Sequence, residues 1–149
     1  MGFSFGTQGQ DGIEFEVVGH EGEPRGGYWD DVALHTHVGV VAGGFRGEFD
    51  ADFQAHELTE FQSELELLFQ MVGGTAELGT STRQVHLTLA RVDAVSAAFV
   101  GIVQVSAVVA DRPSHGNKLG FLLQFDSTQL RASLSELEKV VAEYPVRRN

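Results

Sequence analysis

The most constraining feature of this sequence is that the spacing of its large apolar residues changes along the chain. In "LGFLLQFDSTQLRASL", residues 119–134, large apolar residues alternate up to Phe125 and then recur three or four positions apart. Alternation places side chains on one face of a strand, whereas a spacing of three or four places them on one side of a helix. This stretch therefore predicts a strand that leads directly into a helix.

The polar residues at this change of spacing predict a helix start. Asp126 and Gln129 stand three positions apart, which is the spacing of a capping box. The Asp126 carboxylate also places negative charge at the positive end of the helix dipole. The alternative is a catalytic acid beside hydroxyl groups, but the stretch contains no histidine that would complete a triad. We interpret Asp126 and Gln129 as a structural helix cap.

The same two spacings predict the remaining elements. Alternation predicts strands at 11–19, 30–42, 45–53, 83–92, 94–110 and 118–125, and helical spacing predicts a central helix at 56–72 and a C-terminal helix at 127–143. Strands that cluster before and after one helix favour an α+β fold with an antiparallel sheet of about six to seven strands over parallel βαβ units. No internal repeat or linker is visible, which indicates a single α+β domain over residues 1–149.

Two details of these strands can be predicted further. Gly43 and Gly44 supply the backbone freedom for a tight hairpin, after which Phe45, Phe49 and Phe53 are expected to face inward. The run 94–110 is long for one straight strand, and Gly101 is the expected place of a bend or bulge.

The charge of the chain limits its partners. Ten Lys and Arg residues against 21 Asp and Glu residues give a formal charge of −11, which disfavours nucleic acid and favours a basic protein partner.

The chain has no cysteine, so disulfides and thiolate metal sites are excluded. It shows no secretory signal, and the run 94–110 is too short and too polar for a spanning helix. We expect a soluble, cytoplasmic protein with no membrane contact.

Two acidic groups of residues are candidates for partner binding. Glu48, Asp50 and Asp52 are expected in a row on the outward face of one strand, where a basic partner would offset their mutual repulsion. The second group follows a glycine-rich loop and combines the one tryptophan with two acids: Trp29, Asp30 and Asp31. Aromatic and acidic residues together can anchor an interface with a basic protein, although a tryptophan at a strand start also commonly covers the core.

His35 and His37 are weak candidates for a metal site. They stand two positions apart on a predicted strand and so share one face, as two zinc ligands can. A zinc site needs a third and usually a fourth ligand, which the sequence does not indicate. We therefore expect two solvent-facing histidines and no bound metal or other cofactor.

The sequence lacks the common catalytic motifs. It contains no GxSxG, Walker or GxGxxG pattern, and its carboxylates are too numerous to single out a catalytic pair. These observations argue against an enzyme.

The order of these elements resembles that of small bacterial proteins grouped with the WapI-type immunity proteins. The similarity spans roughly residues 30–145 and includes "GGFRGEF", a helix with Leu58, Phe61, Leu65 and Leu68, and a strand that leads into "FDSTQL". Phe125, Asp126 and Thr128 match a Phe-Asp-Gln-Thr-like sequence of that family, whereas Ser127 replaces its Gln. The resemblance implies a non-enzymatic protein that binds and neutralises a cognate bacterial toxin, as in a toxin–antitoxin pair.

Three functions follow from these observations. The first is an immunity-type inhibitor whose acidic surface binds a basic toxin domain. The alternative is a self-associating structural protein, because both faces of the run 94–110 are apolar, with Val100, Ile102 and Val108 on one side. The third is a metal-dependent hydrolase that uses His35 and His37.

Overall fold

The computed structural model describes residues 1–6, 11–20, 33–70, 74–79, 84–93, 98–109 and 112–145, with the backbone alone for residues 20, 107–109 and 112–117. These residues form eight strands and two helices. The first half of the chain contains β1 (Gly2–Gly6), β2 (Gly12–His20), β3 (Leu34–Ala42), β4 (Phe45–Phe53) and α1 (Ala55–Phe69). The second half contains β5 (Thr75–Gly79), β6 (Val85–Arg91), β7 (Ala98–Val109), β8 (Arg112–Asp126) and α2 (Ser127–Glu143).

The element order of the two halves is the same. Each half forms one antiparallel sheet of four strands in chain order, β1-β2-β3-β4 in the first sheet and β5-β6-β7-β8 in the second. A helix follows the last strand of each sheet almost directly, as the change of spacing at Phe125 predicts. The sequence shows no internal repeat, so the structure reveals a repeat of topology and not of residues.

The structure confirms the α+β class and corrects the prediction of a single sheet. The described residues form eight strands in two sheets and not six to seven strands in one. The two strands missed from the sequence, β1 and β5, have five residues each, and each buries only two side chains: Phe3 and Phe5, or Ala76 and Leu78. Such short runs give too little alternation to be recognised. The central helix ends at Phe69 and not at 72, whereas α2 has the predicted bounds.

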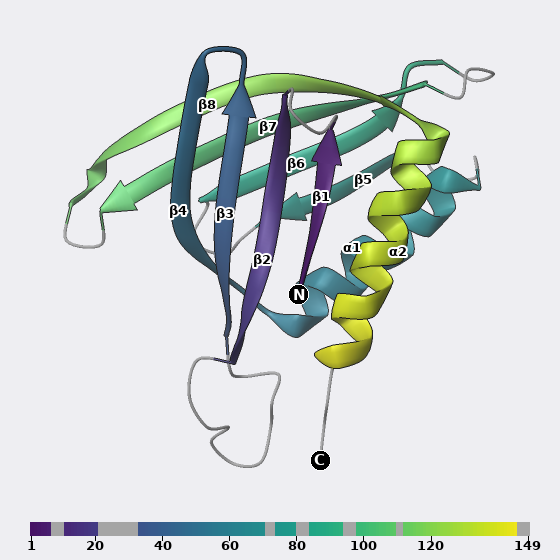
Figure 1. The fold of residues 1–149 in the computed structure, drawn as a ribbon, viewed down its shortest axis with the longest axis horizontal. Helices are drawn as coiled ribbons and strands as arrows, with labels where there is room; N and C mark the ends of the chain where they lie inside the picture. The colour runs from purple at the N-terminus through teal and green to yellow at the C-terminus, as the bar shows by residue number, and fades with distance from the viewer. Residues whose placement is uncertain are drawn as a thin grey trace.

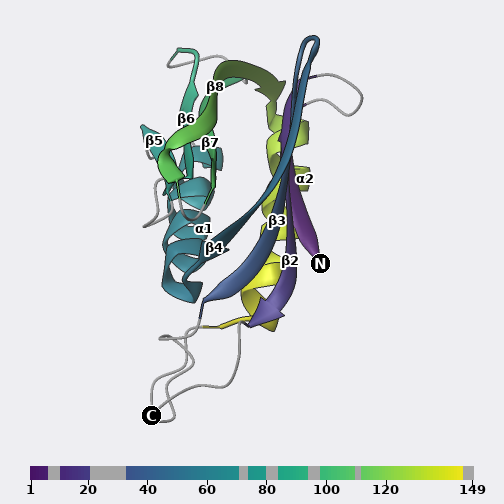
Figure 2. The same cartoon turned by 90° about the vertical axis from the view of Figure 1, so that its left-hand side faces the viewer.

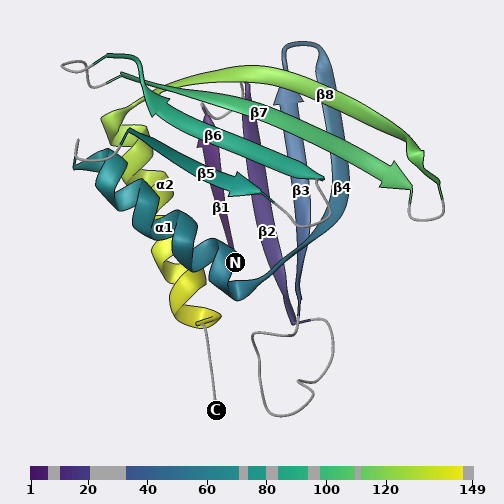
Figure 3. The same cartoon turned by 180° about the vertical axis from the view of Figure 1, so that it is seen from behind.

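The two sheets face one another as two layers, and the helices lie side by side at one end of them (Figures 1 and 2). Viewed from behind, the second sheet lies in front of the first, and their strands cross at a steep angle (Figure 3). The inward side chains of both sheets and the apolar stripes of both helices form one buried cluster. Phe5 illustrates this, because its ring contacts Phe61 of α1 at 5.7 Å and Phe125 of β8 at 6.4 Å between centroids.

Each helix covers the free edge of the first strand of the other half. Ser4 of β1 donates its N–H to Glu136 of α2 and accepts a hydrogen bond from the Ser133 hydroxyl through its carbonyl. In the same way, Glu77 of β5 donates its N–H to Glu64 of α1 at 3.2 Å. An unpaired strand edge is a template for aggregation, and these side chains satisfy some of its backbone groups. Each half therefore contributes a helix that packs against the edge strand of the other half.

Gly101 is not the site of a β-bulge. The pairing of β7 with β8 runs without interruption through Gly101, which lies opposite Leu123, and the register shifts between Ala107 and Val109 instead. Gly101 is buried, and a Cβ atom at this position would lie 2.8 Å from Leu89 Cδ2. The glycine therefore gives room to the packed Leu89 side chain and does not mark a bulge. Among the described helices, none is long and apolar enough to cross a membrane.

Phe45 does not face the core as predicted. It is 69% exposed, whereas Phe53 is buried and Phe49 is partly buried against the core. Phe45 directly follows the hairpin turn, where Gly43 has a φ of 61°, so it lies at the end of the first sheet. Alternation predicts the face of the sheet correctly but not how far the core extends along it.

Candidate functional site

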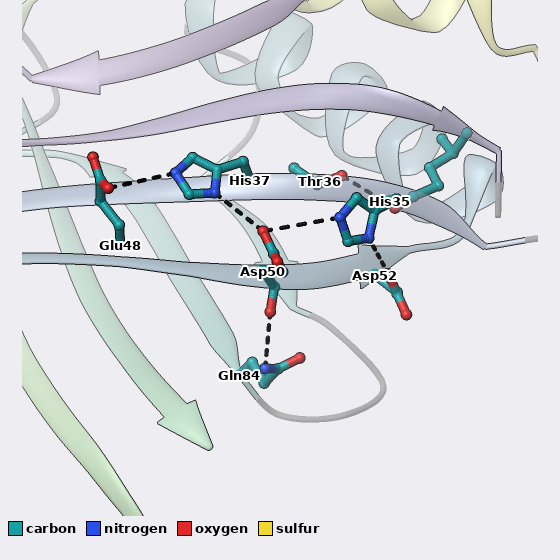
Figure 4. A network of polar contacts seen from close by, with 8 residues as sticks. His35, Thr36, His37, Glu48, Asp50, Asp52 and Gln84 are labelled. Atoms are coloured by element: carbon teal, nitrogen blue, oxygen red, sulfur yellow. Dashed lines mark hydrogen bonds and ion pairs between the residues drawn. The ribbon is translucent and has the colours of Figure 1, made fainter. Parts of the chain in front are cut away.

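The hairpin of β3 and β4 brings the predicted histidines and the predicted row of acids onto one surface. In the register of this hairpin, His35 lies opposite Asp52 and His37 lies opposite Asp50. In an antiparallel strand pair, side chains at directly opposed positions on one face lie next to each other and interact. Figure 4 shows the two imidazoles pointing toward the carboxylates of β4. Two groups considered separately in the sequence therefore form one site.

The contacts at this site form an alternating ladder of imidazoles and carboxylates. His37 Nδ1 lies 3.1 Å from Asp50 Oδ1, and His37 Nε2 lies 3.8 Å from Glu48 Oε2. His35 Nδ1 lies 3.5 Å from Asp52 Oδ1, and His35 Nε2 lies 3.9 Å from Asp50 Oδ1. All five side chains are between 36% and 78% exposed. Exposed ion pairs add little to stability, so this ladder suits contact with a partner better than it suits a role in folding.

The neighbouring strand β2 adds two more carboxylates to the same surface. Glu16 lies opposite His37, Glu14 lies opposite Gly39, and both glutamates are exposed. The amino group of Met1 lies 2.8 Å from Glu16 Oε1. We call this surface of the first sheet the acidic face; it comprises Glu14, Glu16, His35, His37, Glu48, Asp50 and Asp52. The alternation in β2 indicates outward glutamates, but only the pairing of β2 with β3 places them beside the histidines.

A glutamine next to the second sheet holds the backbone of β4, the edge strand that carries the acids. Gln84, directly before β6, donates from Nε2 to the backbone carbonyl of Asp50 at 3.1 Å (Figure 4). The backbone carbonyl of Gln84 accepts the backbone N–H of Ser106 in β7 at 2.8 Å. This chain of hydrogen bonds links the middle of β4 to the second sheet and fixes the backbone that carries Asp50.

The acidic face does not have the geometry of a metal centre. Within the described ranges, no group of three or more His, Asp or Glu side chains is arranged to hold a metal ion. His35 and His37 share Asp50, at 3.9 Å and 3.1 Å, but their other contacts, to Asp52 and Glu48, spread along an open strand pair, whereas ligands of a bound ion converge on one point. The arrangement offers a row of charges to a large partner.

The other predicted site residues lie elsewhere. Trp29, Asp30 and Asp31 fall outside the described residues, so their part in partner binding stays a prediction. Asp126 is the N-cap of α2: its Oδ1 accepts the N–H of Gln129 at 2.8 Å, and Gln129 Oε1 accepts the N–H of Asp126 at 2.9 Å. These two bonds form a complete capping box, which is an architectural arrangement.

Comparisons with known proteins place this chain in a family. No curated protein matches the sequence. A solved structure described as that of the plant transcriptional regulator PBF-2 matches with a TM-score of 0.46 and 15% identity, covering 97% of this chain and 81% of that one. The model of the WapI-like immunity protein family matches residues 4–145, which is nearly the whole chain. The protein therefore belongs to the WapI-like family of immunity proteins.

Proposed function

We propose that this protein is a cytoplasmic, non-enzymatic immunity protein that binds a cognate toxin and neutralises it through the acidic face. Membership of the immunity family supports a protein partner. The observation that carries the choice of surface is the ladder of His35 and His37 with the carboxylates of β4. We further propose that the chain works as one domain, since both halves share a single buried cluster.

The chemistry of the acidic face favours a basic partner. Five carboxylates point outward from two of its strands, and the whole chain carries a formal charge of −11. Such a field accelerates encounter with a positively charged protein and repels acidic ones. Lysine and arginine side chains of a toxin can replace the exposed His–carboxylate contacts at small cost, because these contacts are weak in water. Binding through this face is expected to weaken as the salt concentration rises.

The proposal can be tested with the cognate toxin domain, which is first sought in a large open reading frame directly upstream of this gene. The toxin domain is expressed with and without the immunity protein, growth is recorded, and the dissociation constant is measured by calorimetry at low and moderate salt. The test variant E48Q/D50N/D52N removes three negative charges from the acidic face. The matched control E60Q/E77Q/E143Q removes three exposed charges outside that face, from α1, β5 and α2.

The test variant is expected to bind at least about tenfold more weakly and to lose most of its protection of growth, whereas the control changes affinity by less than about threefold. Equal loss in both variants would show that net charge matters and the acidic face does not. Failure of the parent protein to bind or protect against the toxin would contradict the immunity function itself.

Self-association is a second candidate function, and the outer face of the second sheet favours it. Ile102 is 47% exposed and Leu122 is 60% exposed, and the two lie opposite each other in β7 and β8. Val100 lies on the same face, as the sequence predicts, whereas the side chain of Val108 falls outside the described residues. Two copies that each carry a charge of −11 repel least where they meet through uncharged side chains.

Light scattering of the parent protein and of I102T/L122T separates this candidate from a monomer. A dimer that the double substitution dissociates would support self-association through the second sheet. A parent protein that stays monomeric at the highest soluble concentration would exclude it.

A further inference from the structure

One row of residues crosses all four strands of the second sheet and is unusual in its side chains. Gly79 of β5 lies opposite His86 of β6, His86 lies opposite Gln104 of β7, and Gln104 lies opposite Gly120 of β8. Glycine at both ends leaves the row without side chains on either side of the histidine and glutamine. A hollow of about 660 Å³ lies here, and its described lining includes this whole row. Its volume is in the range of small-molecule sites.

A buried hydroxyl group in this hollow lacks a partner. Ser106 lines the hollow and is 8% exposed, and its Oγ forms no hydrogen bond with any described residue. The backbone N–H of Ser106 is satisfied by the carbonyl of Gln84 at 2.8 Å, so only the side chain is left. A buried hydroxyl without a partner is costly, and such groups in native proteins usually have a functional reason. This observation points to a ligand with a hydrogen-bonding group.

The charges and donors of the hollow select an anionic group. Lys118 lies opposite Ser106 in the β7–β8 pairing, and it is the one lysine or arginine of the described lining. His86 and Gln104 add N–H donors, and no carboxylate belongs to the described lining. An ammonium group with several neutral donors matches the oxygens of a carboxylate or phosphate. The described lining also includes Val85, Val105 and Leu119, whose side chains pack in or against the core between the sheets.

We propose that this hollow binds a small organic anion, a carboxylate or a phosphate monoester. The oxygens of the anion accept hydrogen bonds from Ser106 and Lys118, and His86 and Gln104 provide further N–H donors. The site lies on the second sheet, whereas the proposed toxin-binding surface lies on the first. The two proposals therefore rest on different residues and can fail separately.

The ligand class is tested with four probes that share a six-carbon chain. Hexanoate and hexyl phosphate carry the anionic head, hexylamine carries a cation and hexanol is neutral. Amide chemical shifts of the labelled protein are followed by NMR during titration. We expect saturable shifts at Gln104, Ser106 and Gly120 with one or both anions and none with the other two probes. The relative affinities of hexanoate and hexyl phosphate show whether a carboxylate or a phosphate is the preferred head.

Three substitutions test the residues of the hollow, and all three leave the fold intact by design. K118Q removes the charge, S106A removes an unpartnered hydroxyl, and G120L fills the hollow. A Cβ at Gly120 would meet only the Val103 carbonyl, at 3.8 Å, so a side chain is tolerated there. The matched control K139Q removes an exposed lysine from α2. Thermal unfolding of each variant confirms that it is folded.

We expect K118Q and S106A to weaken binding of the preferred anion by at least about fivefold, in line with a charge-assisted and a neutral hydrogen bond. G120L is expected to abolish binding, and K139Q is expected to change it by less than about twofold. Three results would overturn the proposal: no saturable binding of either anion, equal binding of hexylamine, or anion binding that survives all three substitutions.

Discussion

The two sheets of this protein are alike on their inner faces and different on their outer faces. Both inner faces are apolar and meet in one core, and α1 and α2 each contribute a row of buried apolar side chains to it. The outer face of the first sheet carries five carboxylates and two histidines, whereas that of the second carries exposed Ile102 and Leu122 beside a hollow. The same topology thus presents two chemically unlike surfaces.

This difference shows which positions the fold constrains. An inward side chain must fit a packed core, so its volume and polarity are restricted. An outward side chain on an antiparallel sheet faces water and is restricted much less. The outer faces are therefore free to carry function, and their divergence between the halves suggests two separate uses of them.

The largest expected effect concerns the glycines at the centres of the two sheets. A Cβ atom at position 101 would lie 2.8 Å from the side chain of buried Leu89. We therefore expect Gly101→Val to lower the free energy of unfolding by about 1–3 kcal/mol. Gly39→Val in the first sheet is the control, because a Cβ there meets no atom within 4 Å. Chemical denaturation measures both. Equal losses would contradict the view that packing, and not strand conformation, requires Gly101.

The helix starts of the two halves differ in their N-cap residues. Asp126 is a favoured N-cap, and Asp126→Ala is expected to cost about 1 kcal/mol. Gln54 occupies the equivalent position before α1 and is not among the favoured residues, so Gln54→Ala should cost less. Thermal melts compare the two variants. A loss in Gln54→Ala as large as that in Asp126→Ala would show that cap chemistry does not distinguish the halves.

A third comparison uses the other residue of each cap. Gln129 occupies the third position of α2 and Glu57 that of α1, where Glu57 Oε1 accepts the N–H of Gln54 at 2.7 Å. Burial raises the pKa of Glu57 above its ordinary value of 4.5, although the Gln54 hydrogen bond and nearby His56 act against this rise. A raised folded pKa stabilises the fold below the unfolded pKa, and this contribution is lost as the pH rises through the folded pKa.

Glu57→Gln gives α1 the residue that α2 already has and removes this titration. We expect the variant to gain stability relative to the parent as the pH rises from about 4 to about 8, with the smallest difference at the acidic end. Thermal unfolding across this range provides the measurement. A difference that is constant with pH would contradict the direction of the Glu57 shift.

The smallest effect on stability is expected from the outer faces themselves. We expect the variants E48Q/D50N/D52N on the first sheet and I102T/L122T on the second to change the free energy of unfolding by no more than about 0.5 kcal/mol per substitution, relative to the parent. Denaturant titration at moderate salt tests both variants. A cooperative loss of several kcal/mol in either would mean that this outer face belongs to the folding unit and is not free for function.

Much of the fold follows from local spacing. Alternation indicated six of the eight strands and the outward direction of the acids in β4, and helical spacing indicated both helices. The short strands β1 and β5 were missed because two buried side chains are too few to define a period. The bulge considered at Gly101 does not occur, because a glycine that gives room to a packed side chain has the same local signal as one at a bulge.

The candidate sites required information that no local pattern contains. His35, Asp50 and the rest of the ladder were each recognised, but their contact depends on the register of β3 with β4. The row from Gly79 to Gly120 joins residues of four strands, and nothing in the sequence marks them as neighbours.

The sequence by itself determined the class of the longer segments, the side of each predicted strand that turns to water and the strong negative charge, because these depend on residues close together in the chain or on composition alone. Tertiary structure alone decided that the strands divide into two sheets, that each helix covers the opposite half, and which outward side chains meet. Those outcomes depend on packing between distant segments, where the free energy of the whole core, and not the preference of any one segment, selects the arrangement.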